Sequence, residues 1–213
     1  MKTRQKGFTL VEIAIVLVII GLLLGGILKG QEMITQAKIK NVIADFSGVS
    51  AAYYGYQDRY RAIPGDDPGA TRWAAATAGS GNGVVAGAYN STTATDESRL
   101  WWDHLRRSGF VAGSGTQQPF NAVAGMIGVQ TGDAAASPAA ALGGFTGLIV
   151  CSANLPDKIA IAVDTQVDDG ASAPGSVRAG LQTAPNMTID GTVVPPGAYA
   201  ETGTNVYVLC RGM

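Results

Sequence analysis

The sequence predicts an α+β fold in which one long N-terminal helix packs on an antiparallel β-sheet built by the C-terminal half. Three observations support this prediction. A helical pattern without proline runs from Phe8 to Tyr60 and ends at Pro64-Gly65. The second half of that helix carries a one-sided apolar seam, and the C-terminal half contains short apolar runs bounded by turn residues.

The N-terminal segment is long and apolar enough to cross a membrane. Phe8 to Leu28 is 21 residues long with one charge, Glu12, and at 1.5 Å per residue it spans roughly 31 Å. Lys2, Arg4 and Lys6 precede it and should stay cytoplasmic, with the rest of the chain outside. No small-residue cleavage site follows the apolar run, so we expect an anchor that continues as helix.

The second half of this helix is amphipathic, and the whole helix would be about 80 Å long. Its seam is too short for a free-standing coiled-coil stalk, the alternative interpretation, and its tyrosines suit packing on a sheet better. The seam residues follow 3-4 spacing: Ile39, Val42, Phe46, Val49, Tyr53, Tyr56 and Tyr60.

Glu12 is anomalous in this setting. A carboxylate inside an apolar membrane segment costs roughly 2.5–3.5 kcal/mol on insertion scales. Its position near the membrane edge would relieve part of that cost. Otherwise the carboxylate needs a partner, and the segment itself contains no basic residue.

The stretch Lys6-Gly7-Phe8-Thr9-Leu10-Val11-Glu12 resembles the class III signal of type IV pilins and pseudopilins. The resemblance covers about the first 30 residues directly and the rest of the helix by pattern. It implies that a prepilin peptidase cuts between Gly7 and Phe8 and methylates the Phe8 amine. It also implies that Glu12 neutralises the amino terminus of a neighbouring copy during assembly, which agrees with the need of a buried carboxylate for a counter-charge.

The same resemblance implies a structural filament subunit with a cleaved leader (1–7), a long helix (8–62, of which 8–28 spans the membrane) and a head (63–213). The chain would be a single-pass inner-membrane protein with a periplasmic C-terminus, and later part of a cell-surface filament with copies of itself or other pilins. A type IV pilus subunit, major or minor, is favoured, because major pseudopilins are typically smaller and lack a cysteine pair. The alternatives are a pseudopilin of a type II secretion system and a membrane-anchored periplasmic binding module.

Composition argues against other classes of function. The net charge of −1 makes nucleic acid an improbable partner. One histidine and two cysteines are too few for a zinc site, and no Ser/His/Asp arrangement indicates an enzyme or a cofactor. We interpret His104 as a surface residue.

One departure from the pilin pattern concerns the middle of the helix. Many type IV pilins carry a proline there, and this chain has none before Pro64. Gly25, Gly26 and Gly30 either supply the same weakness, at about 1 kcal/mol each, or permit close packing between membrane helices.

The head should contain two further helices and several strands. One helix opens at Asp67-Pro68 and stops near Gly79, and another spans Asp96 to Ser108 with Trp101 and Leu105 on its buried face. The expected strands are 147–151, 158–163 and 206–210, with a hairpin at 187–194 around Asp190-Gly191.

Two groups of residues are candidate sites in the head. Cys151 and Cys210 end apolar strands outside the cytoplasm, so a disulfide fits, two free thiols being the alternative. Such a bond also resembles the cysteine-closed loop of many type IV pilins.

Asp164, Asp168 and Asp169 form a calcium candidate, but their spacing is not that of an EF-hand, and a solvated turn explains them better. We therefore expect no metal site.

Overall fold

The computed structural model describes residue 7 and residues 9–135 and 139–213. The chain divides into two units, Met1–Ala37 and Lys38–Met213, and helix α1 (Leu10–Tyr60) runs through both. The long helix is thus confirmed from Leu10 onward. Phe8, Lys2, Arg4 and Lys6 lie outside the described residues.

In the first unit, the large apolar side chains of α1 are exposed. Leu10 and Leu22, for example, are 85% and 73% exposed. The helix continues without interruption through Gly25, Gly26 and Gly30, and no described side chain lies against these glycines. By length and composition, α1 is the one helix of the described chain that could cross a membrane.

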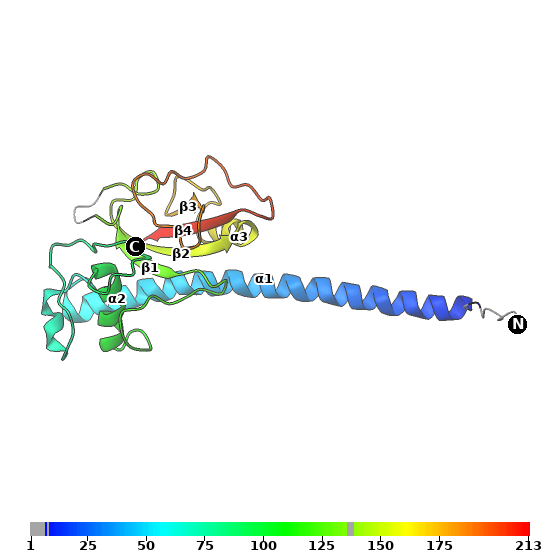
Figure 1. Cartoon of the computed structure of the whole chain (residues 1–213), viewed down its shortest axis with the longest axis horizontal. Helices are drawn as coiled ribbons and strands as arrows, with labels where there is room; N and C mark the ends of the chain where they lie inside the picture. Colours follow the sequence, from blue (N-terminus) through cyan, green and yellow to red (C-terminus); the bar gives the residue numbers. More distant parts are fainter. Residues whose placement is uncertain (1–6, 8, 136–138) are drawn as a thin grey trace, which may run out of the picture. The chain divides into compact units, whose positions relative to one another are not determined.

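The second unit contains a four-stranded antiparallel sheet in the order β1-β2-β4-β3 (Figure 1). Two predicted strands, 147–151 and 206–210, are confirmed as parts of β2 and β4. The strands are β1 (Ile127–Thr131), β2 (Leu148–Pro156), β3 (Val177–Leu181) and β4 (Val206–Gly212).

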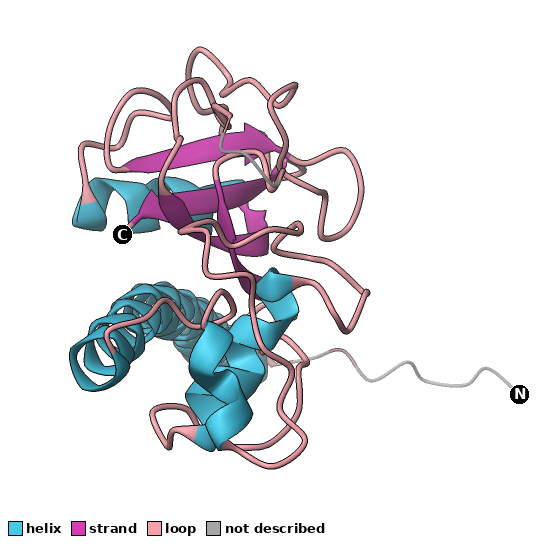
Figure 2. Cartoon of the chain, turned by 90° about the vertical axis from the view of Figure 1, so that its left-hand side faces the viewer, coloured by secondary structure: helices cyan, strands magenta, loops and turns pink. Residues whose placement is uncertain are grey.

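Helices cover one face of this sheet, and loops cover the other (Figure 2). The first face packs on the seam of α1 and on helices α2 (Glu97–Arg107) and α3 (Asp157–Val167). Five of the seven seam residues are buried, and Tyr53 and Tyr60 are partly buried. The second face is covered by residues such as Tyr89, Leu142 and Ile189. Successive side chains of a strand point to opposite faces, so burial of both faces explains the unbroken apolar runs in β2 and β4.

The predicted strand at 158–163 is wrong, because this segment belongs to helix α3. Its buried residues Ile159, Ala160, Val163 and Asp164 have helical spacing, which a short apolar run obscures. Pro156, which ends β2, provides the break between strand and helix.

Two further expectations about the head are also wrong. Residues 187–194 form a turn without strands, because Met187, Ile189 and Val193 pack on the second face of the sheet instead of pairing. The helix expected from Asp67 to Gly79 is a single 3₁₀ turn, Pro68–Arg72, although Asp67 does cap it by accepting a hydrogen bond from the Gly69 amide.

Candidate processing and assembly site

The junction between Gly7 and Phe8 precedes the first helical residue, Leu10. Gly7 is exposed, and no described atom lies within 4 Å of the position that a Cβ would take there. The residue that would become the new N-terminus, Phe8, lies outside the described residues. Among the described residues, nothing obstructs access to Gly7.

Glu12 caps the start of α1. Its Oε2 accepts a hydrogen bond from the Thr9 amide and another from the Thr9 hydroxyl, both 2.7 Å long. In return, the Glu12 amide donates to Thr9 Oγ1 at 3.3 Å. This is a capping box, in which a Ser or Thr and an acidic residue three positions later satisfy each other's backbone donors.

Thr9 is therefore a functional residue that the sequence analysis missed. The Thr-x-x-Glu spacing ahead of an apolar run was its signal. Within the described part of the chain, Glu12 forms no ion pair. The donors that the cap supplies to Glu12 Oε2 are neutral, so the cap itself does not compensate the negative charge.

The comparison with protein families supports the same segment. The family model described as the prokaryotic N-terminal methylation motif matches residues 2–28. The chain carries a type IV pilin-like prepilin signal. No curated protein and no solved structure matches the chain.

The signal and the fold agree with each other. A long apolar helix packed on a four-stranded antiparallel sheet is consistent with the pilin fold. The motif at residues 2–28 supports a prepilin similar to type IV pilins or pseudopilins. Its signal implies processing by a prepilin peptidase and assembly with pilins, and its apolar helix indicates membrane anchoring before assembly.

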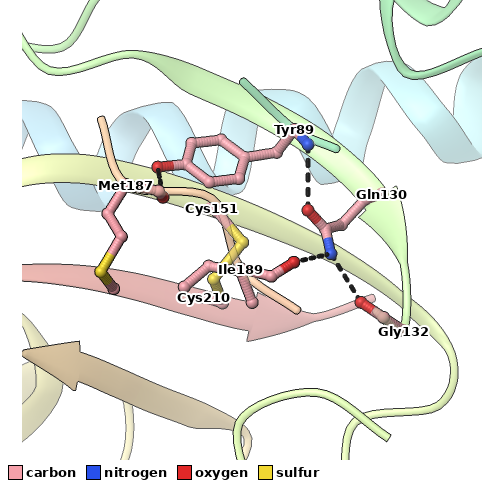
Figure 3. Close-up of a disulfide and its surroundings, with 7 residues drawn as sticks. All are labelled: Tyr89, Gln130, Gly132, Cys151, Met187, Ile189 and Cys210. Atoms are coloured by element: carbon pink, nitrogen blue, oxygen red, sulfur yellow. Dashed lines mark hydrogen bonds between the residues drawn. A yellow bond between two sulfur atoms is a disulfide. The ribbon is translucent and has the colours of Figure 1, made fainter. Parts of the chain in front are cut away.

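The predicted disulfide between Cys151 and Cys210 is confirmed. The two cysteines lie directly opposite each other on β2 and β4, with Cα atoms 4.0 Å apart. Both are fully buried on the second face of the sheet, and Figure 3 shows Tyr89, Met187 and Ile189 around them. The bond joins two central strands that are 59 residues apart in sequence.

Gln130 of β1 fixes the loops beside the disulfide (Figure 3). Its side-chain oxygen accepts from the Tyr89 amide at 2.9 Å, and its side-chain nitrogen donates to the Gly132 and Ile189 carbonyls at 2.6 and 2.9 Å. The Tyr89 hydroxyl donates to the Met187 carbonyl at 2.7 Å. This fully bonded polar network lets three loops cover an apolar surface without leaving backbone groups unsatisfied.

The structure brings Asp164, Asp168 and Asp169 together at the C-terminal end of α3, with one oxygen from each carboxylate within 4.8 Å of the others. Asp164 is fully buried and accepts a 2.5 Å hydrogen bond from the Tyr199 hydroxyl. Burial, together with the negative charges of Asp169 and Asp168, raises the pKa of Asp164 to about 6.

The interpretation of His104 as a surface residue is wrong. It is fully buried on the face of α2 that also carries Trp101 and Leu105, a helical spacing that was present in the sequence. Its Nδ1 accepts from the Gly65 amide at 2.9 Å, and its Nε2 lies 2.8 Å from the Thr77 carbonyl. These partners require a neutral ring with the proton on Nε2, and burial accordingly lowers the pKa of His104.

Two acidic residues next to Gly65 hold the loop that follows α1. Asp66 accepts four hydrogen bonds from residues 80–83. Asp67 pairs with Arg72 at 2.7 Å and accepts a 2.5 Å bond from the Tyr56 hydroxyl. Although burial tends to raise the pKa of Asp67, the bonds from Arg72 and Tyr56 lower it overall. The head is thus attached to the seam of α1 by polar contacts as well as by apolar packing.

Proposed function

We propose that the chain is a structural subunit, major or minor, of a type IV pilus-like filament. One observation carries the proposal: a carboxylate, Glu12, lies at the start of an exposed apolar helix just after a peptidase signal, and it has no ion-pair partner among the described residues. A plain membrane anchor needs neither the signal nor the charge. A subunit that polymerises through this helix needs both, because each Glu12 would meet the Phe8 amine of another copy.

The head supports a pilus subunit over a secretion pseudopilin. The resemblance associates large heads and a C-terminal cysteine pair with pilins, and this chain has 213 residues and the Cys151–Cys210 bond. A disulfide between central strands also suits a filament exposed outside the cell, where oxidising conditions keep it closed. The head would then lie in the periplasm before assembly and on the cell surface afterwards.

The test is to shear surface filaments from cells that produce this chain and to analyse them by mass spectrometry. We expect the chain to be present, to begin at Phe8 and to carry a methyl group on the Phe8 amine. Replacement of Gly7 by a bulky residue should leave an unprocessed membrane precursor and no filaments containing the chain.

A matched control is Gly21→Ala, a glycine substitution in the same segment but away from the junction, where no described atom lies within 4 Å. This variant should be processed normally. Filament-derived protein that still begins at Met1 would refute the processing step. Processed protein found only in a periplasmic secretion complex would favour the pseudopilin, and processed protein found in no filament would favour the anchored binding module.

A further inference from the structure

A groove beside the second half of α1 contains a carboxylate, Asp45, that has no partner among the described residues. The groove has a volume of about 280 Å³ and is lined by α1, by α2 with the segment after it, and by the segment that leads into β1. We propose that it receives Lys40 of a second copy of the chain, which forms an ion pair with Asp45. This proposal rests on the filament function proposed above and adds a contact between the second halves of two α1 helices.

Asp45 is half-buried, and nothing in its own chain compensates its charge. Among the described residues, none of the ion pairs involves Asp45, and no hydrogen bond reaches its carboxylate. Burial raises the pKa of Asp45. A carboxylate that loses water and gains no donor destabilises the fold. A cation from another molecule would offset this cost, so the carboxylate indicates a site that a second chain completes.

The walls around Asp45 are apolar and held in place. Phe120 is 65% exposed, yet its backbone is fixed by a β-bridge to Met126. Phe110 packs so closely on α1 that a Cβ at Gly55 would lie 2.6 Å from its ring. The α1 side stays open, because no described atom lies within 4 Å of a Cβ placed at Gly48. An apolar groove with one carboxylate suits lysine, which has an apolar stem and a charged end.

Few cations of a second copy are free to enter this groove. The basic residues of the second unit whose side chains form no ion pair, hydrogen bond or ring contact in the described chain are Lys38, Lys40, Lys158 and Arg211. Copies that polymerise through α1 insert in one orientation, so neighbouring α1 helices run parallel. Only the two lysines on α1 therefore have a depth that the helix itself sets, about 10.5 and 7.5 Å from Asp45.

The side of the helix on which each lysine lies favours Lys40. Lys38 precedes Asp45 by seven residues and lies on the same side of α1. A filament repeats a contact between two different surfaces of each copy, so the partner of Asp45 has to lie on another side. Lys40 is exposed and lies about 140° around the helix from Asp45. A neighbour shifted by about 7.5 Å along the helix would bring its Lys40 to Asp45.

Carbodiimide cross-linking of wild-type filaments tests the contact directly, because this reagent joins a carboxylate to an amine that already touches it. We expect an amide bond between Lys40 of one copy and Asp45 of the next, and covalent multimers on denaturing gels. Trypsin does not cut after an acylated lysine, so the joined peptide should contain residues 39–59 of one copy and 41–59 of the other. A bond within one chain would contain residues 41–59 only once, a difference that the mass reveals.

Charge reversal measures what the ion pair contributes to assembly. Asp45→Lys and Lys40→Asp should each lower filament yield at least about tenfold, because like charges would then meet at every contact. The variant that carries both substitutions should recover most of the yield. Neither side chain has a partner in its own chain, so the unfolding temperatures of the purified variants in detergent should stay within about 2 °C of the wild type.

Asp58→Lys is the matched control. Asp58 lies on the same helix, outside the groove, and its exposed side chain lies 3.7 Å from Arg61. Exposed pairs of this kind contribute little. The control makes the same change of charge as Asp45→Lys and should leave filament yield unchanged.

Several results would overturn the contact. Wild-type filaments in which Asp45 is joined to no amine, or to a lysine other than Lys40, would exclude the pair. Normal yield from Asp45→Lys would do the same, as would two defective single variants that the double variant does not rescue. All these results leave the filament function intact, because filaments with the chain beginning at Phe8 would still form. If wild-type cells produce no filament containing the chain, the filament function fails and this contact fails with it.

Discussion

The two halves of α1 belong to one helix but have opposite surroundings. Ile19 in the first half is 51% exposed, whereas Ile39 in the second half is 1% exposed and packs in the core. Burial of an isoleucine side chain stabilises a fold by roughly 1.5–3 kcal/mol. The second half gains this stabilisation from its own chain, and the first half has to gain it from a membrane or from other copies.

The two halves of α1 should therefore respond differently to substitution. In the second half, the seam residues must fit the head, so their substitution should change the stability of a single molecule. In the first half, nearly every large apolar residue is exposed, and so continuous a patch indicates a surface that other molecules cover. Substitutions there should change anchoring or assembly and leave the stability of the head unchanged.

The largest effect should come from Glu12→Gln. Glutamine can still form the capping box with Thr9, so the variant removes the charge and keeps the helix start. A buried charge left without its partner costs about 3–5 kcal/mol, a few hundred-fold or more at every contact between copies. We expect filament yield to collapse, whereas membrane levels and cleavage after Gly7 stay near normal, as measured by shearing and by immunoblotting of membrane fractions.

Glu32→Gln is the control for this prediction. Glu32 lies on the same helix but forms a solvent-exposed ion pair with Lys29 at 2.9 Å, and exposed pairs of this kind contribute little. The control should assemble normally. Wild-type filament yield from cells that produce only the Glu12→Gln chain would contradict pairing between Glu12 and the Phe8 amine.

The disulfide provides the next largest effect, and it should be confined to the head. Replacement of both Cys151 and Cys210 by alanine should lower the free energy of unfolding by about 4 kcal/mol, because the bond closes a long loop. This corresponds to a fall of about 8–16 °C in the unfolding temperature of the full chain in detergent. Membrane insertion should be unchanged, since the first half of α1 has no part in the bond.

Peptide mapping under non-reducing conditions checks the bond itself. Recovery of both cysteines as alkylatable thiols from wild-type filaments would contradict a role for the disulfide in the mature protein. If the variant that lacks both cysteines left the membrane fraction while its head was still folded, this result would contradict the separation of the two units.

A matched pair of substitutions tests the two halves of α1 directly. Ile39→Ala should lower the free energy of unfolding of the head by about 2–5 kcal/mol, because it empties a packed site. Ile19→Ala removes the same atoms from an exposed position and should change it by less than about 0.5 kcal/mol. Thermal unfolding followed by near-ultraviolet circular dichroism measures both. Similar losses for the two variants would show that the first half contributes to the core.

The sequence predicted the helix far better than the head, for a physical reason. The signal of α1 is local and repeated, since an apolar run followed by 3-4 spacing leaves few alternatives over such a length. The Thr9–Glu12 cap was equally local and was overlooked. The disulfide was predictable because two cysteines allow only one pairing within the chain.

Elements of the head depend on distant contacts, and there the local pattern misled. Strand β1 contains Gly128 and Gln130, which look unfavourable in a strand. Gly128 is required because a Cβ would lie 2.0 Å from the Tyr89 carbonyl oxygen, and Gln130 is required by the loops that it bonds. The acidic cluster is similar, since its residue types were visible but the burial of Asp164 follows only from the packing of α3.

The smallest effect we predict is a pH dependence of head stability that arises from His104. In the folded head, burial lowers its pKa, and protonation would remove the acceptor that Nδ1 offers to the Gly65 amide. In the unfolded chain its pKa is about 6.5. The unfolded state therefore binds more protons as the pH falls through about 6.5, and the free energy of unfolding decreases by up to about 1.4 kcal/mol per pH unit until the folded pKa is reached.

His104→Asn should be less stable at every pH, because it leaves a cavity, but its stability should lack this decrease. The free energy of unfolding is measured for both proteins at a series of pH values between 7.5 and 5. Subtracting one pH profile from the other cancels the contributions of the carboxylates, which both proteins share. A difference that stays constant over this range would show that His104 remains neutral in both states or is exposed in the folded head. Because the histidine lies in the second unit, the same acidification should leave the anchoring of the first half of α1 unchanged.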